Sequence, residues 1–230
     1  MIKNNKGTKQ PFINAFLIHQ RPYLEKKCIA HLFTQEYGML PTITHLSKKK
    51  RDQLHLFTPL SCQILMQTSM SQLKQIECKA TLPPLQGKYL FAGLYINELL
   101  YRLCQEGEAY ENLYTCYQHS LHQLSKRENL ALTVRSFEHR LQIFLGYSPN
   151  YTIIDEHDDL WFSFDPELGL KPSISKHSQH YHRDQLQDLA NGKLSCPQTQ
   201  ATSKHIFALT IKQILGENSL FITKMLPKSL

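Results

Sequence analysis

The hydrophobic pattern of the chain changes its period near residue 82, and this change constrains the fold more than any other feature. Before it, short apolar runs alternate with polar residues, and from the segment 93–103 onward apolar residues recur at helical spacing. A period of two is typical of half-buried strands, whereas spacings of three and four are typical of helices with one buried face. The sequence therefore predicts an α+β protein with a β-rich domain at residues 1–82 and a helical domain at residues 83–230.

Short apolar runs with the pattern of strands are found at residues 15–18, 28–33, 39–44, 62–66 and 76–82. So many short strands in so few residues fit a small barrel better than a sandwich, and we expect a five-stranded OB-fold. Pro41 indicates an edge or the start of a strand, since proline cannot donate a ladder hydrogen bond. Pro83 and Pro84 end the region for the same reason.

Helical spacing begins with a row of side chains four residues apart, formed by Phe91, Tyr95, Leu99 and Leu103. A helix that is apolar on so much of its surface is expected to be buried. Further helices are predicted at residues 113–124, 134–144, 183–190 and 202–215. Gly146 is expected to be the C-cap of the helix that ends at residue 144. An irregular insert is expected at about 148–182, with Trp161–Phe164 as one strand of a small hairpin.

The charge of the chain indicates a polyanionic partner. Lysine and arginine number 26 against 19 aspartate and glutamate residues, which gives a formal net charge of +7 and a pI near 9.0. Such a balance favours nucleic acid over an anionic membrane surface. A basic chain without a charged partner is the alternative, and only the distribution of the charge separates the two.

The strongest local concentration of charge is Lys48-Lys49-Lys50-Arg51, which falls between the third and fourth expected strands and is therefore predicted to be a loop. Adjacent cations on a loop suit phosphate contacts, which are strong, independent of sequence and sensitive to salt. A solvated loop with no partner is the alternative, but an OB-fold beneath the loop favours nucleic acid. Aromatic side chains available to stack on bases, or to join the core, are Tyr23, Phe33, Tyr37 and Phe57.

Sequence signatures of catalysis and metal binding are weak. The cysteines Cys28, Cys62, Cys78, Cys104, Cys116 and Cys196 form no C-x-x-C pair, so we expect neither a thiolate zinc site nor a redox motif, and most should be small core residues. Nucleotide-binding loops and hydrolase motifs are absent from the sequence. We therefore expect no enzyme and no cofactor.

Two polar segments leave an alternative open. His177, His180 and His182, with Asp184 and Cys196, have the composition of a metal site, but H-x-x-H-x-H is not a common zinc pattern. A polar loop leading into a helix is the preferred interpretation, and a metal-dependent enzyme that uses residues 177–184 is kept as the alternative. Asp155–Asp159 lacks the spaced oxygen ligands of a calcium loop and is expected to be a solvated acidic loop.

Sequence features of membrane insertion and export are not found. No apolar run reaches the ~20 residues that cross a bilayer, and the basic start Met1–Lys6 is not followed by the apolar stretch of a signal peptide. The expected location is therefore the cytoplasm, without membrane contact.

Several blocks of the sequence resemble one known family. These blocks are residues 15–25, 32–38, 57–60, 85–87, 93–100, 135–138 and 145–147. In this order and spacing, between about residues 14 and 147, they are similar to the bacterial recombination mediator family RecO. Gly93-Leu94-Tyr95-Ile96-Asn97-Glu98-Leu99-Leu100 is close to the most characteristic string of that family.

The resemblance implies an N-terminal OB-fold, a helical domain and a small insert, with a non-enzymatic role in the RecF pathway. Members bind single- and double-stranded DNA, anneal complementary strands and pair with RecR. They also bind the acidic C-terminal tail of single-stranded DNA-binding protein (SSB), which helps RecA to load. Arg135 matches an arginine of the family that helps to bind this tail, and an apolar groove with Arg135 at its rim is expected. A different OB-fold protein that binds RNA remains an alternative.

The chain departs from the family pattern in places that concern function. The four-cysteine zinc site of many relatives is missing, because Ser148–Asp159 contains no cysteine. The basic loop is compressed to Ser47–Arg51, and the C-terminal basic motif is poorly matched by Lys224 and Lys228. The expected DNA contacts are Lys48, Lys49, Lys50 and Arg51, with Arg21 and Lys74.

Overall fold

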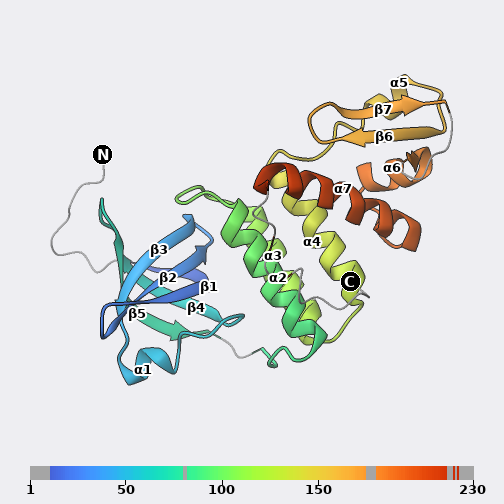
Figure 1. The fold of residues 1–230 in the computed structure, drawn as a ribbon. Coiled ribbons are helices and arrows are strands. Elements are labelled where there is room, and N and C mark those ends of the chain that lie inside the picture. Colours follow the sequence, from blue (N-terminus) through green and yellow to red (C-terminus); the bar gives the residue numbers. More distant parts are fainter. Residues whose placement is uncertain (1–10, 80–81, 175–179, 217–219, 221, 223–230) are drawn as a thin grey trace. The chain divides into compact units, whose positions relative to one another are not determined.

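The structure is a computed structural model of the chain (Figure 1). It describes residues 11–79, 82–174, 180–216, 220 and 222. Its residues form two compact units. The first comprises Met1–Pro84 and Asn97–Thr115, and the second comprises Leu85–Ile96 and Cys116–Leu230. Helices α2 (Lys88–Leu103) and α3 (Glu111–Ser125) contribute residues to both units. Each unit is therefore described by itself.

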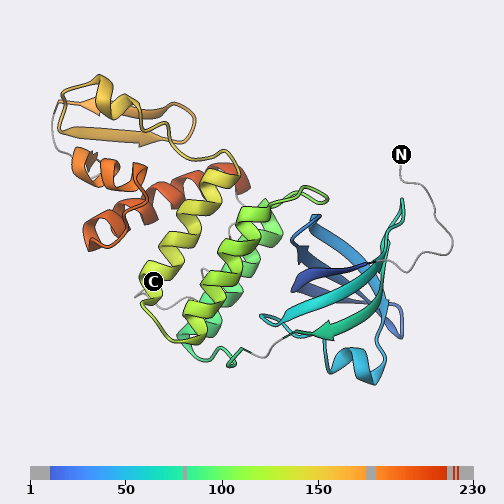
Figure 2. The ribbon, with the colours of Figure 1, turned by 180° about the vertical axis from the view of Figure 1, so that it is seen from behind.

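The first unit contains a closed barrel, seen from two sides in Figures 1 and 2. Its strands are β1 (Phe12–Tyr23), β2 (Lys27–Thr34), β3 (Gly38–His45), β4 (Pro59–Leu65) and β5 (Ser71–Cys78). They close in the order β1-β2-β3-β5-β4, and the only parallel pairing among them joins β3 to β5. This confirms the OB-fold expected from the sequence.

The strand boundaries differ from those expected. Strand β1 continues to Tyr23, far beyond the apolar run, because its polar residues still pair with β2 as far as Lys27. Strand β5 ends at Cys78 rather than at residue 82. Pro41 lies inside β3, where it pairs with His31 of β2 and has no partner on β5, which is an edge position and not a strand start.

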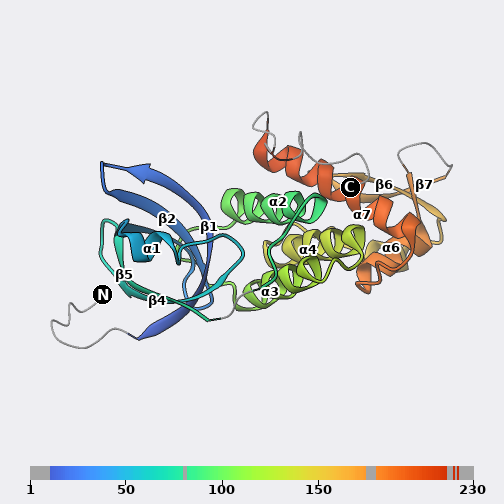
Figure 3. The same cartoon turned by 90° about the horizontal axis from the view of Figure 1, so that it is seen from below.

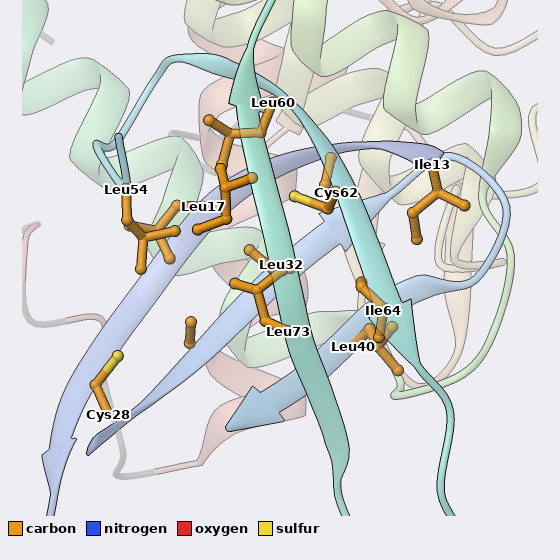
Figure 4. Close-up of a cluster of buried hydrophobic side chains, with 13 residues drawn as sticks. Ile13, Leu17, Cys28, Leu32, Leu40, Leu54, Leu60, Cys62, Ile64 and Leu73 are labelled. Carbon is orange, nitrogen blue, oxygen red and sulfur yellow. The ribbon is translucent and has the colours of Figure 1, made fainter. Parts of the chain in front are cut away.

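Side chains from all five strands fill the barrel, at alternate positions in β1, β2 and β4 (Figure 4). Leu17, Leu32 and Leu60 have no exposed surface, and Leu54 covers them from the β3–β4 connection. Cys28 and Cys62 belong to this core, and Cys104 and Cys116 are also buried, as expected. Cys78 is exposed and Cys196 is partly exposed, so four of the six cysteines are buried, in agreement with the expectation for most of them.

The prediction that Lys48–Arg51 forms a loop was wrong, since these residues form the single helical turn α1 (Lys48–Arg51). Ser47 is its N-cap, and its hydroxyl accepts a hydrogen bond from the backbone N–H of Lys50 at 3.3 Å. Serine at this position satisfies a backbone donor that the helix leaves free. The turn therefore holds its cations on an ordered backbone.

Strand β1 contains a bulge, and after it each side chain points to the opposite face of the sheet from the one that regular alternation would give. Leu17 pairs with Leu32, but the next pair is His19 with His31, so Ile18 is an extra residue. The carbonyl of Ile18 accepts a hydrogen bond from the Asn97 side chain of α2 at 3.2 Å. Asn97 is buried and lies in the most characteristic string of the sequence. It thus acts structurally, as partner of a backbone group at the irregularity.

We expect Asn97→Leu to lower the free energy of unfolding by about 1–3 kcal/mol, the cost of leaving a buried polar group without its partner. Leucine has the same branched arrangement of four side-chain heavy atoms, so the shape of the side chain is kept while its polar groups are removed. Urea unfolding followed by circular dichroism measures the difference. Asn112→Leu, at an exposed position of α3, is the control and should change little. An Asn97→Leu variant with an unchanged free energy of unfolding would contradict the role given to this side chain.

Helices α2, α3 and α4 (Leu130–Phe144) lie where the periodicity places them. Asn129 caps α4 by accepting from the backbone N–H of Leu132 at 3.1 Å. At the other end, Gly146 follows the C-cap Leu145 rather than being the cap itself, and its φ of +75° is the left-handed conformation that favours glycine. The N–H of Tyr147 then reaches the carbonyl of Gln142, which closes the helix.

The second unit also contains a small sheet beside two helices (Figures 1 and 3). Its elements are α5 (Ile153–Glu156), β6 (Trp161–Asp165), β7 (Gly169–Ser173), β8 (His180–His182), α6 (Arg183–Ala190) and α7 (Pro197–Leu215). The sheet order β7-β6-β8 confirms the expected hairpin and adds a third strand. Phe162 of β6, Leu186 of α6 and Ile206 of α7 share its core.

The region expected to be irregular is more ordered than its sequence indicated. Part of the expected acidic loop forms α5, whose Ile154 is buried. Helix α7 begins at Pro197, five residues before the predicted start at Thr202, because proline is favourable in a first helical turn. None of the helices in the described ranges is both long and apolar enough for a bilayer crossing.

Candidate nucleic-acid interface

The cations of α1 divide into two groups. Lys48, Lys49 and Arg51 are exposed. Lys50 is half-buried, and its Nζ donates to Thr44 Oγ1 at 2.9 Å and to the backbone carbonyl of Leu73 at 3.0 Å. Burial, followed by the charge of Lys74, lowers the pKa of Lys50. Lys50 therefore ties β3 to β5 at one end of the barrel, and three cations of α1 face solvent.

The two remaining expected DNA contacts lie on strands. Lys74 is exposed on β5, where its Nζ donates to Gln72 Oε1 at 2.5 Å, and its charge acts on Lys50. Arg21 is exposed on β1, opposite Ile29 of β2. Lys74 is thus grouped with α1, whereas Arg21 belongs to the face of β1 and β2.

Lys26 and Lys27 are further exposed cations of the candidate interface, and they were not among the residues expected from the sequence. Both are exposed in and beside the β1–β2 turn. The backbone N–H of Leu46 donates to the carbonyl of Lys26 at 2.9 Å, and Lys27 pairs with His45, so this turn lies beside the residues that lead into α1. Two adjacent lysines were a visible signal, but only strand pairing brings them close to residues 48–51. The exposed cations of α1 and this turn are called the basic end below.

The aromatic residues considered for stacking occupy different environments. Phe33 is fully buried and packs against Tyr114 with ring centroids 5.7 Å apart, so it belongs to the core. Phe57 is partly buried. Tyr23 and Tyr37 are 42% and 40% exposed, and these two remain accessible.

Arg135 of α4 is buried rather than standing at the rim of a groove. It is 6% exposed, and its guanidinium lies 2.6 Å from Glu138 Oε2. The Tyr95 hydroxyl donates to the other carboxyl oxygen of Glu138 at 2.5 Å. Burial raises the pKa of Glu138 to about 7, against the opposing influence of Arg135 and Tyr95. The arginine is therefore engaged within the helical unit, and an external carboxylate would compete with Glu138 for it.

A pocket of about 300 Å³ lies on a different face of α4. Its lining residues are Ser136, His139, Arg140, Ile143, Phe144, Ala190, Gly192 and Leu194. Ile143 is 50% exposed and Arg140 is exposed. An apolar floor beside an arginine can hold a peptide that ends in apolar and acidic groups.

The histidine-rich segment has structural roles in its described part. His182 accepts from the backbone N–H of Asp184 and caps α6, and His180 lies 3.2 Å from the Ser173 hydroxyl. Cys196 precedes α7, where its Sγ contacts Gln198. Within the described ranges, no group of three or more histidine, cysteine, aspartate and glutamate residues could hold a metal ion. His177, Lys224 and Lys228 lie outside the described residues.

Comparison with known proteins gives matches in both halves of the chain. Residues 12–82 match the family described as Recombination protein O N terminal, and residues 85–152 match Recombination protein O C terminal. The chain is 28% identical over 214 residues to the DNA repair protein RecO of Psychromonas ingrahamii, covering 88% of this chain and 92% of that protein. The RecO protein of Actinobacillus succinogenes is 27% identical over 92% of this chain and 93% of its own length. That of Nitrosospira multiformis is 35% identical over 58% of this chain and 57% of its own length.

Proposed function

Because the chain belongs to the RecO family of DNA repair proteins, we propose that it is a recombination mediator that binds single- and double-stranded DNA and anneals complementary strands. The observation that carries this proposal is the basic end of the OB barrel. Lys48, Lys49 and Arg51 stand exposed on an ordered turn beside Lys26 and Lys27. Clustered cations on an OB-fold support phosphate contacts that do not depend on base sequence.

Residues 1–82 are the proposed nucleic-acid-binding domain, and residues 83–230 are the proposed partner-binding domain. We assign no catalytic step and no cofactor to either. The proposed protein partners are RecR and the acidic C-terminal tail of SSB, with RecA loading as the result and the cytoplasm as the location. The positive net charge supports both kinds of contact, because phosphates and an acidic tail are anionic.

Strand annealing on DNA coated with SSB tests this function. Two complementary oligonucleotides labelled with a fluorophore and a quencher are each coated with SSB and mixed with the purified chain. The expected result is annealing much faster than with SSB alone, and a slower reaction when the SSB lacks its acidic tail. Equal rates with and without the chain would contradict the proposal.

Substitution of Arg135 and substitution of Arg140 test two different sites for the acidic tail. If Arg135 binds the tail carboxylates, Arg135→Ala weakens binding of a labelled tail peptide about tenfold, the loss of one charge-assisted hydrogen bond to a carboxylate. If the pocket on α4 holds the peptide, Arg140→Ala has this effect instead. Fluorescence anisotropy of the peptide measures both, and DNA binding by either variant should be retained.

A matched control is available in the same helical domain. Arg127 is exposed at the end of α3 and away from the pocket lining, so Arg127→Ala should bind the tail peptide like the unchanged chain. Full peptide binding by both Arg135→Ala and Arg140→Ala would remove α4 from the proposed tail site.

A further inference from the structure

The bulge in β1 gives one face of the barrel an unusual set of side chains. Leu17 and Leu32 point into the core, so regular alternation would place Ile18 opposite His31. Because Ile18 is an extra residue, His19 lies opposite His31 instead, and the residues that follow in steps of two share its face. Beyond the bulge, the outer face of β1 therefore carries His19, Arg21 and Tyr23, all of them exposed.

A tyrosine of α2, the helix whose Asn97 side chain donates to the carbonyl of Ile18, completes this face. Tyr101 lies four residues after Asn97, which places both on one side of α2. Its ring centroid is 4.9 Å from that of His19 and 4.9 Å from that of His31, and the two imidazole centroids are 6.0 Å apart. Tyr101 is 38% exposed. His19, His31 and Tyr101 are called the ring cluster.

The ring cluster has an unmet hydrogen-bonding group and an adjacent cation. Nε2 of His31 is buried and has no hydrogen-bond partner among the described residues. Burial, then the charges of His19 and Arg21, lower the pKa of His31, so its ring is neutral at physiological pH. A neutral imidazole offers its face for stacking, and Arg21 is close enough to His31 to act on its ring.

The ring cluster continues into the basic end without a break in the sheet. Along the outer face, the pair His19–His31 is followed by Arg21–Ile29 and then by Tyr23–Lys27. Lys27 is in turn paired with His45, which lies two residues before the N-cap of α1. A strand of nucleic acid whose phosphates follow the cations would thus pass the rings.

We propose that the ring cluster stacks an unpaired base of single-stranded DNA while Arg21 contacts a neighbouring phosphate. This inference rests on the DNA binding proposed above and names the residues that distinguish single strands from duplex. Bases of a single strand can rotate onto aromatic rings, whereas bases of a duplex are already stacked on one another. The basic end serves both forms of DNA, because phosphates are common to both.

Tyr101→Leu tests the proposal in the full-length chain. The probes are a labelled thymidine oligonucleotide, a duplex of the same length, and a thymidine oligonucleotide containing one 2-aminopurine, whose fluorescence changes when it stacks. Tyr101→Leu should weaken single-strand binding about 5- to 20-fold, as expected for the loss of one stacked base, and leave duplex binding within about twofold. Tyr101→Phe, which keeps the ring, should restore single-strand binding and the 2-aminopurine signal.

Tyr147→Leu is the matched control, because Tyr147 is 46% exposed and follows α4, outside the ring cluster and the residues considered for stacking. It should bind both DNA forms like the unchanged chain. His19→Ala provides a second, exposed variant with the same expected result if Tyr101→Leu does not fold. Equal losses on single strands and duplex, or no loss on either, would overturn the ring cluster while DNA binding stands. Failure of the unchanged chain to bind DNA would overturn the proposed function itself.

Discussion

Replacing Lys48, Lys49 and Arg51 together with glutamine should lower the affinity for single-stranded DNA about a hundredfold at about 0.1 M salt. The reason is counterion release, in which each phosphate contact changes the slope of log K against log salt by about 0.7 for single strands and about 0.9 for duplex. Loss of three contacts therefore makes this negative slope shallower by about 2 for single strands. Fluorescence anisotropy titrations between about 0.05 and 0.3 M salt measure both quantities.

Lys50 provides the internal control for this prediction. Its ammonium group bonds to Thr44 and to the carbonyl of Leu73, so it is not available to a phosphate. We expect Lys50→Gln to lower the free energy of unfolding by about 1–3 kcal/mol, as for the loss of hydrogen bonds from a charged donor, with little change in the salt slope. An unchanged slope in the triple variant would remove α1 from the DNA interface.

Glu138→Ala should destabilise the folded chain by about 3–5 kcal/mol, because it leaves the buried guanidinium of Arg135 without its partner. Arg135→Ala should lower the free energy of unfolding by a smaller amount. Arginine cannot lose its charge in a protein, whereas Glu138 can bind a proton when its partner is removed, since its pKa is already raised to about 7. Urea unfolding at pH 7 measures both variants. Equal costs, or a larger cost for Arg135→Ala, would contradict this account of the pair.

The pH dependence of stability gives a second measurement on the same group. Between the ordinary pKa of 4.5 and the folded value of about 7, Glu138 holds a proton in the folded chain that the unfolded chain has released. The contribution of this group to stability is therefore full below pH 4.5 and is lost as the pH rises toward 7. Glu138→Gln should remove this dependence, and Tyr95→Phe should retain most of it.

The order of elements could be predicted from the sequence, because hydrophobic periodicity reports the face that each segment buries. Strands β1 to β4 and helices α2 to α4 were expected at the right places, whereas β5 begins at Ser71 and not at residue 76. The end of β1 was not, since Arg21 and Tyr23 are held in the sheet by backbone pairing rather than by apolar contacts. Helix α1 was not expected either, because four cations give no periodic signal.

The candidate site was predicted only in part, for reasons of packing. Lys48 and Lys50 are the same residue type two positions apart, yet one is exposed and the other joins two strands. Arg135 was expected to face a groove, and its burial depends on Glu138 and Tyr95, the second of which lies on another helix. Lys26 and Lys27 joined the basic end only through their pairing with the residues before α1.

The sequence by itself determined the change from strands to helices, the net positive charge and the family resemblance, because each of these depends on residue types and their spacing along the chain. The tertiary structure decided which cations face solvent and which rings meet. Asn97, His19, His31 and Tyr101 are brought together by one bulge and one helix, and contacts between residues so far apart in the chain arise only when the barrel closes.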